Sequence, residues 1–201
     1  MSEPKRIVLA TRNQGKVREF NKLFAQLGWE GISLAEFEDV PEVVEDGDTF
    51  EANAIKKAVT ISTYLNLSAV GDDSGLEVDA LDGRPGVYSA RYAGEDATDE
   101  ANWKKLLQEL TDVPDEKRTA RFRCTLALVE PGQEPLIATG SCEGTIAREP
   151  AGTNGFGYDP VFYLPAMDKR MAELSAEEKN QISHRAMAMQ QLLEVIQKNK
   201  Q

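Results

Sequence analysis

The chain has 201 residues, of which 41% are hydrophobic and 28% are charged, with a formal net charge of −11 at pH 7. This length is enough to bury a core as one domain, which we expect over residues 1–201. The acidic balance excludes a dedicated nucleic-acid binder, whose affinity depends on basic surface. The sequence has neither a run of roughly 20 apolar residues nor an apolar signal segment, so we expect no membrane partner.

The only two cysteines are Cys124 and Cys142, and they form no CxxC pair. Cysteines this sparse are typical of reduced thiols in a cytoplasmic protein. The alternative of a single bridge between them stays open at this point.

The first segment predicts a strand at residues 7–10, a polar loop at 11–16 and a helix with apolar residues at helical spacing. Lys16 and Arg18 fall in the first turn of that helix, where cations oppose the helix dipole. A bound phosphate would account for them, because backbone N–H groups at a helix N-terminus favour an anion. The loop is not a Walker motif, since Val17 replaces the Ser or Thr. Solvated cations are the alternative.

Residues 36–48 are acidic, and we expect an irregular solvated loop there that can lend one metal ligand. Thr49 or Asp48 then caps a helix with one apolar face. Asn53 and Lys57 lie four residues apart in this helix, so they share a face.

The central stretch, residues 69–78, holds Asp72, Asp73 and Ser74 between Gly71 and Gly75. The two glycines predict a turn at a strand end, where short polar side chains reach a ligand. Successive residues of an extended segment point to opposite faces, so only one of the two aspartates can face a given site. This favours one carboxylate that shares a metal with a distant partner. A surface turn with a solvated acid pair is the alternative.

The second half predicts a helix that opens at Thr98 or Asp99, a strand at 119–128 and further strands at 135–141 and 144–147. Residues 151–160 are rich in glycine around Phe156, which favours a ring exposed for ligand stacking over a plain loop. A capping box at 175–178 starts the last helical region. The lone His184 interrupts that region, and it is either structural or part of a donor-rich wall with Lys179 and Arg185.

Taken together, these motifs resemble the inosine/xanthosine triphosphate pyrophosphatase family, whose members hydrolyse deaminated purine nucleotides. The match runs in order along nearly the whole chain, through residues 11–16, 49–58, 72–75, 85–92, 155–160, 171–174 and 183–185. The resemblance implies an α/β fold with a long mixed twisted sheet, flanking helices and two lobes around a central cleft. It also implies a homodimer that depends on Mg²⁺.

Carried over residue by residue, the resemblance makes Asp73 the proton acceptor and a metal ligand. Because Mg²⁺ prefers oxygen ligands, Glu45 is the second candidate ligand, with Asp72 in reserve. It implies that the nucleoside triphosphate is bound by Thr11, Arg12, Asn13, Gln14, Gly15, Lys16, Lys57, Ser74, Phe156, Gly157, Tyr158, Asp159, Lys179, His184 and Arg185.

The sequence departs from the family pattern at two places. Many members carry Glu immediately before the asparagine that matches Asn53, whereas this chain has Ala52 there and Glu51 one place earlier. If that carboxylate matters, its role passes to Glu51 or Glu45. Many bacterial relatives have Gly where Arg12 stands, so the loop carries a further cation for phosphate.

The implied reaction is attack of water on the α-phosphorus, which releases a nucleoside monophosphate and pyrophosphate. Positioning and charge neutralisation dominate such transfers, and Mg²⁺ accepts one or two carboxylates together with phosphate oxygens. Arg185 carries donors only, which suits the 6-oxo group of hypoxanthine or xanthine and opposes the 6-amino group of adenine. A broader nucleotide pyrophosphatase and an inactive nucleotide-binding regulator remain as alternatives.

Overall fold

The computed structural model describes residues 3–199, which fall into two compact units. Unit 1 contains the chain up to Asp73, residues 124–140 and the chain from Arg185 onward. Unit 2 contains residues 74–123 and 141–184. The chain therefore crosses between the units four times, and neither unit is one continuous segment.

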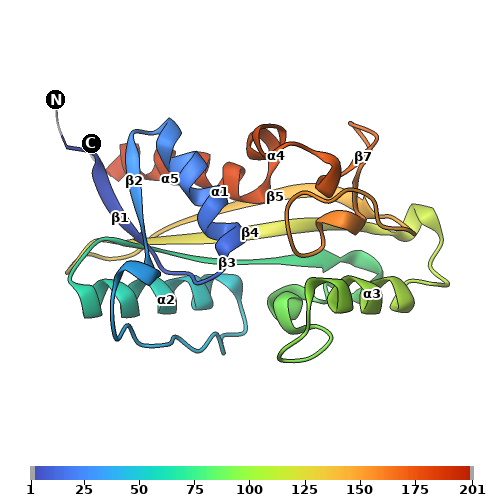
Figure 1. Ribbon diagram of the computed structural model, residues 1–201, viewed down its shortest axis with the longest axis horizontal. Coiled ribbons are helices and arrows are strands. Elements are labelled where there is room, and N and C mark those ends of the chain that lie inside the picture. Colours follow the sequence, from blue (N-terminus) through green and yellow to red (C-terminus); the bar gives the residue numbers. More distant parts are fainter. Residues whose placement is uncertain (1–2, 200–201) are drawn as a thin grey trace. The chain divides into compact units, whose positions relative to one another are not determined.

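Within residues 3–199, seven strands form a single mixed sheet, which confirms the expected α/β class (Figure 1). The strand order is β2-β1-β3-β4-β5-β6-β7. β1 pairs in parallel with both β2 and β3, whereas β6 is antiparallel to β5 and β7. The strands are β1 (Lys5–Leu9), β2 (Trp29–Ser33), β3 (Ala69–Val78), β4 (Thr119–Val129), β5 (Leu136–Ile146), β6 (Phe162–Leu164) and β7 (Lys169–Arg170).

The first four α-helices of the described chain begin where the sequence supplies caps. Asn13, Thr49, Thr98 and Ser175 each accept a hydrogen bond from a backbone N–H in the first turn of their helix. The helices are α1 (Gln14–Gln26), α2 (Phe50–Leu65), α3 (Asp99–Glu109), α4 (Ala176–Ile182) and α5 (His184–Asn199). Short 3₁₀ helices are η1 (Leu34–Glu36), η2 (Asp79–Leu81), η3 (Gly86–Arg91), η4 (Asp115–Lys117), η5 (Asp159–Val161) and η6 (Met171–Glu173).

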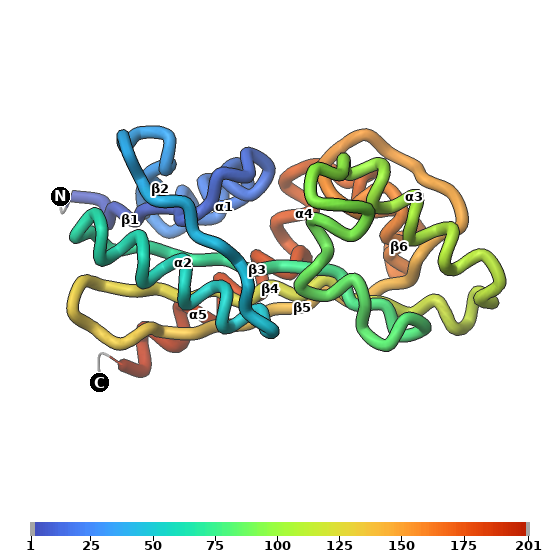
Figure 2. The backbone as a smooth tube through the Cα atoms, turned by 90° about the horizontal axis from the view of Figure 1, so that it is seen from below, coloured from blue at the N-terminus to red at the C-terminus, as the bar shows by residue number. Residues whose placement is uncertain are grey.

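In unit 1 the strands are covered on both faces (Figure 2). Ile7 and Leu9 of β1 pack with apolar residues of α1 and α5, whereas Val8 and Ala10 pack on the other side with Ile61 of α2. This alternation follows from the two-residue period of a strand. Strands covered on both faces read as continuous apolar runs, as residues 7–10 do.

β3 packs closely against the backbone of α2 at Gly71. A Cβ atom there would lie 2.1 Å from the carbonyl oxygen of Ala54 and 2.9 Å from the backbone nitrogen of Ala58. Because backbone atoms cannot rotate away, we expect Gly71→Ala to lower the free energy of unfolding by about 3 kcal/mol, measured by urea denaturation. Gly31→Ala is the control, since its nearest neighbour is the movable side chain of Asn21. Equal losses in the two variants would contradict this explanation.

Unit 2 has its own apolar core between β3, β4, β5, β6 and α3. Leu76 and Val78 of β3 contribute to it together with Leu106 of α3 and Phe122 of β4. The core also includes Tyr158, so the end of the glycine-rich loop is anchored by a buried ring.

Two predicted element boundaries are wrong. Asp72 and Asp73 lie inside the continuous strand β3, not in a turn at a strand end. The segments 135–141 and 144–147 fall, apart from residues 135 and 147, within the one strand β5. Within residues 3–199, no helix combines the length and the apolar character needed to cross a membrane.

Candidate functional site

The loop between β1 and α1 is shaped by its own side chains. The hydroxyl of Thr11 accepts a hydrogen bond from the backbone N–H of Asn13, and the Asn13 side chain accepts one from the N–H of Lys16. Gln14 and Gly15 open α1. The exposed Arg12 side chain donates to the carbonyl of Val40 in the acidic segment. The predicted phosphate loop is therefore a capped helix N-terminus, a geometry that favours anions.

Asp72 is an almost fully buried carboxylate held by two cations. Its oxygens lie 2.6 Å from the Lys16 ammonium and 3.7 Å from the Arg185 guanidinium nitrogen Nε. Burial alone would raise the pKa of Asp72, but the charges of Lys16, Arg185 and Lys57 outweigh it and hold that pKa well below its usual range. The ion pair with Asp72 accounts for a lysine in the first turn of α1. The Asp72 carboxylate is therefore already paired with the cations of Lys16 and Arg185.

Asp73, the next residue of β3, has different surroundings from Asp72. Its Oδ2 accepts a 2.8 Å hydrogen bond from the Asn53 side chain, and the residue is 6% exposed. Burial raises the pKa of Asp73 to about 6, against the opposing effects of Asn53, Lys16 and Lys57, and the charge of Glu45 raises it further. A carboxylate whose pKa lies near neutral pH is the type of group that serves as a general base.

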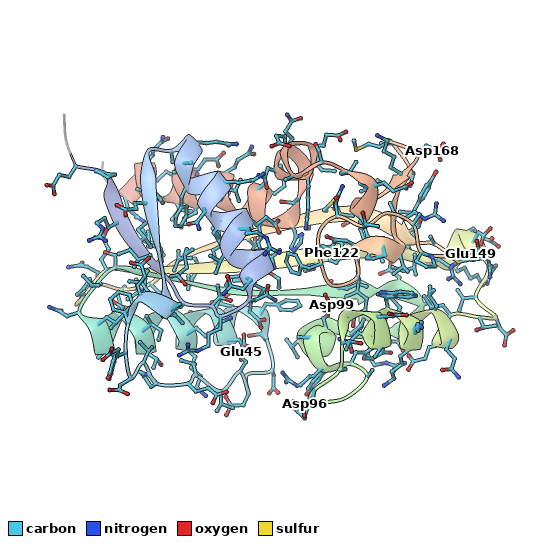
Figure 3. All side chains as sticks on the ribbon, in the orientation of Figure 1. Glu45, Asp96, Asp99, Phe122, Glu149 and Asp168 are labelled. Atoms are coloured by element: carbon cyan, nitrogen blue, oxygen red, sulfur yellow. The ribbon has the colours of Figure 1, made fainter. Side chains whose placement is uncertain are left out.

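Glu45 lies in the acidic segment before α2 (Figure 3). Its carboxylate pairs at 2.7 Å with the buried ammonium of Lys57. Two carboxylates, Glu45 and Asp73, fit Mg²⁺, which completes its shell with waters and phosphate oxygens. The raised pKa of Asp73 supports this fit, because a cation there would offset the burial of its charge. Within the described residues, no group of three or more His, Cys, Asp or Glu side chains is arranged to hold a metal by itself.

In unit 2, the glycine-rich loop (residues 151–160) is organised by the buried Asp159. Its Oδ2 accepts hydrogen bonds from the Phe156 backbone N–H at 3.1 Å and from the Lys179 ammonium at 2.8 Å. That ammonium also lies 4.7 Å from the centre of the Phe156 ring. Gly155 and Gly157 have φ values of +73° and +63°, which favour glycine, and a Cβ atom at Gly155 would lie 2.1 Å from Asp159 Oδ2. The structure thus brings together three of the predicted binding residues.

The remaining predicted residues are divided between the units. His184 is buried in unit 2 and stacks on Phe122, with ring centres 4.9 Å apart. Tyr158 is buried there too, and its hydroxyl donates to the carbonyl of Ser89. Ser74 is half-buried and begins the part of β3 that belongs to unit 2. Arg185, in unit 1, is 2% exposed.

Two residues of the site were not predicted from the sequence. Asn53 is buried and donates a hydrogen bond to Asp73. The sequence feature that could have indicated it is its position one turn before Lys57 on the same face of α2. Glu19 is buried and pairs at 3.2 Å with Arg185. The sequence feature that could have indicated it is its place four residues before Leu23, which puts a carboxylate on the apolar side of α1.

Both cysteines are buried free thiols. The thiol of Cys124 lies 3.1 Å from the Asp72 carboxylate in unit 1. Burial is the main cause that raises the pKa of Cys142, in unit 2, to about 11. The open alternative of a bridge is therefore wrong.

Comparison with known proteins gives a consistent result. The family model described as Ham1 family matches residues 7–195. A dITP/XTP pyrophosphatase of Geobacillus kaustophilus is 58% identical over 94% of this chain and 92% of the relative. A protein of the same name from Shouchella clausii is 54% identical over 95% and 96%. The solved Ham1 protein of Staphylococcus aureus is 45% identical, with a TM-score of 0.84 over 98% of this chain and all of that one.

Proposed function

Because the chain belongs to the Ham1 family, we propose that it is a nucleoside triphosphate pyrophosphatase that hydrolyses deaminated purine nucleotides such as ITP, dITP and XTP. The products are the nucleoside monophosphate and pyrophosphate. The observation in the chain's own residues that carries the proposal is the buried Asp73, with a pKa of about 6, among Lys16, Lys57 and Asn53.

Asp73 is proposed as the group that takes the proton of the attacking water. A bound Mg²⁺, held by Asp73 and Glu45, would supply charge neutralisation at the phosphates. The N-terminus of α1, with Lys16, is proposed to bind phosphate oxygens, since the positive end of the helix dipole and a cation both favour an anion. Lys57 is proposed to contribute a second positive charge near the same carboxylates.

The residues proposed to recognise the base belong to unit 2, apart from Arg185. Phe156 offers a ring for stacking, with Lys179 on one side of it. His184 and Arg185 carry hydrogen-bond donors, which suit a 6-oxo purine. Adenine would set its 6-amino donor against such groups, at roughly 1–3 kcal/mol for each group left unpaired. Several contacts must therefore act together to reject it.

The whole chain is proposed to act as one functional domain, because the family model spans both units. A homodimer in the cytoplasm is proposed on the family resemblance alone. These assignments of assembly and location do not enter the chemistry above.

The proposed function is tested by pyrophosphate release from ITP, XTP, ATP and GTP in the presence of Mg²⁺. We expect kcat/KM for ITP and XTP to exceed that for ATP by at least about 100-fold, and a chelator to abolish turnover. Equal turnover of all four would favour a broad nucleotide pyrophosphatase. Binding of ITP without any pyrophosphate release would favour the regulatory alternative.

A further inference from the structure

Phe156 is held on both sides of its Cα atom by carboxylates. The peptide N–H before that atom donates to Asp159 at 3.1 Å, and the next N–H, that of Gly157, donates to Asp99 Oδ2 at 2.9 Å. Two fixed peptide groups leave the backbone of Phe156 little freedom, so they fix the direction of its Cα–Cβ bond, from which the ring extends to within 4.7 Å of the Lys179 ammonium. The two carboxylates come from different places, because Asp159 is local whereas Asp99 opens α3.

Asp99 is not needed by its own helix as a cap. The side chain of Thr98 already caps α3 by accepting the N–H of Ala101. Asp99 is the first residue of α3 (Figure 3), and its carboxylate accepts a hydrogen bond from the glycine-rich loop. The bond joins residues 58 positions apart in the chain. It is therefore a tertiary contact made from an exposed side chain to the peptide that follows Phe156.

The rest of the loop is fixed by other elements of unit 2. The Asn154 backbone N–H and side chain donate to carbonyls of Ala172 and Leu174 at and next to η6. The Tyr158 hydroxyl donates to Ser89 of η3. Between these anchors, the peptide that joins Phe156 to Gly157 is held at its N–H by Asp99 at 2.9 Å and at its carbonyl by the backbone N–H of Asp159 at 3.3 Å. Loss of the Asp99 bond would leave this peptide with only the longer of these two bonds, while the anchors on either side remain.

We propose that Asp99 is a positioning residue that sets the Phe156 ring for stacking on the base of the substrate, an inference that rests on the proposed function. Asp99 itself touches neither base nor phosphate in this proposal. It acts by ordering the loop before the nucleotide arrives, so its removal weakens binding of the base and leaves the phosphate chemistry intact.

Three variants separate this role from a general structural one. Asp99→Ala removes the acceptor. Asp99→Asn keeps a side-chain oxygen that accepts the Gly157 N–H, while it removes the negative charge at the N-terminus of α3. Asp96→Ala is the matched control, because Asp96 is an exposed acid in the loop before α3 (Figure 3) and no hydrogen bond or ion pair to it occurs within residues 3–199.

Binding is measured with ITP in the absence of metal and with inorganic tripolyphosphate, which has no base. We expect Asp99→Ala to raise the Kd and the KM for ITP about tenfold, with kcat within about threefold and tripolyphosphate binding unchanged. Asp99→Asn and Asp96→Ala should stay within about twofold of wild type for every value. Hydrogen exchange at the Gly157 amide should accelerate about tenfold in Asp99→Ala only.

Several outcomes would overturn the positioning role. One is unchanged ITP binding in Asp99→Ala, and another is an equal loss for ITP and tripolyphosphate, which would indicate general damage. A third is a loss in Asp99→Asn as large as in Asp99→Ala. If wild type binds ITP with the expected dependence on Asp99 but releases no pyrophosphate, the proposed function fails and the positioning role stands. If wild type binds no ITP, both fail.

Discussion

Replacing Asp73 by Asn is expected to lower the rate of pyrophosphate release by about 10³-fold and to make the metal-free protein more stable at neutral pH. Activity falls because the amide cannot accept the proton of the attacking water. Stability rises because folding raises the pKa of this carboxyl from 3.8 to about 6, which means that burial destabilises its ionised form. Such a shift corresponds to about 2–3 kcal/mol, or roughly 5 °C in Tm for a chain of this size.

The sign of this effect sets its pH dependence. A raised carboxyl pKa favours folding fully below the unfolded value near 3.8, and this advantage is lost as the pH rises through about 6. The Tm of Asp73→Asn should therefore exceed that of wild type at neutral pH and match it near pH 4. Added Mg²⁺ should stabilise wild type and leave the variant unchanged. A variant that loses activity but gains no stability would refute the assignment of strain to Asp73.

Replacing Arg185 by Met is expected to lower the free energy of unfolding by about 3–5 kcal/mol, which is the second large effect. The Arg185 guanidinium is almost fully buried and lies 3.2 Å from Glu19 and 3.7 Å from Asp72. Its removal leaves two buried carboxylates with one partner fewer. Urea denaturation at neutral pH measures the loss, and it needs no assumption about the role of Arg185 in binding.

A second variant shows whether the unpaired charge causes the loss. Adding Glu19→Gln to Arg185→Met removes one of the two stranded carboxylates, so the double variant should recover about half of the lost stability. The exposed Arg12→Met provides the control and should change the free energy of unfolding by less than about 0.5 kcal/mol. A loss of less than about 1 kcal/mol in Arg185→Met would contradict this prediction, because it would show that water solvates the two carboxylates that lose their partner.

Features that depend on neighbouring residues were predictable from the sequence. The caps at Thr49 and Thr98 and the capping box at Ser175 and Glu178 are found where the sequence indicates them. Each of these signals acts within one helical turn, so no distant contact can displace it. The burial of Cys124 has a similar local cause, because the two-residue period of β4 places it on the same face as the buried Phe122 and Leu126.

The wrong boundaries have one physical cause. Gly71 was read as a turn residue and Gly144 as the first residue of a separate strand, yet both lie within long strands. At each of them the missing side chain permits close packing, against the backbone of Ala54 at Gly71 and against Tyr163 and the Phe162 ring at Gly144. A glycine that makes a turn and a glycine that makes room look alike in a sequence.

The pairing of buried charges was not predictable for a different reason. The contacts of Asn53 with Asp73 and of Glu19 with Arg185 join distant parts of the chain. Sequence spacing indicates which face of a helix a residue occupies, but not which strand or helix that face will meet. Only the packed structure decides that Asp72 meets cations while Asp73 retains a raised pKa.

The division of each unit among separate chain segments has a consequence for synthesis on the ribosome. The apolar face formed by Ile7 and Leu9 is completed by Ala186, Met189 and Leu192 of the last helix, from the opposite end of the chain. The first strands therefore leave the exit tunnel with this face covered only in part, by α1, and the cover is not complete until residues 186–192 have been made. Such high contact order delays folding and prolongs exposure to aggregation. Ribosome-bound chains that stop before residue 185 should thus be far more sensitive to protease than the released protein.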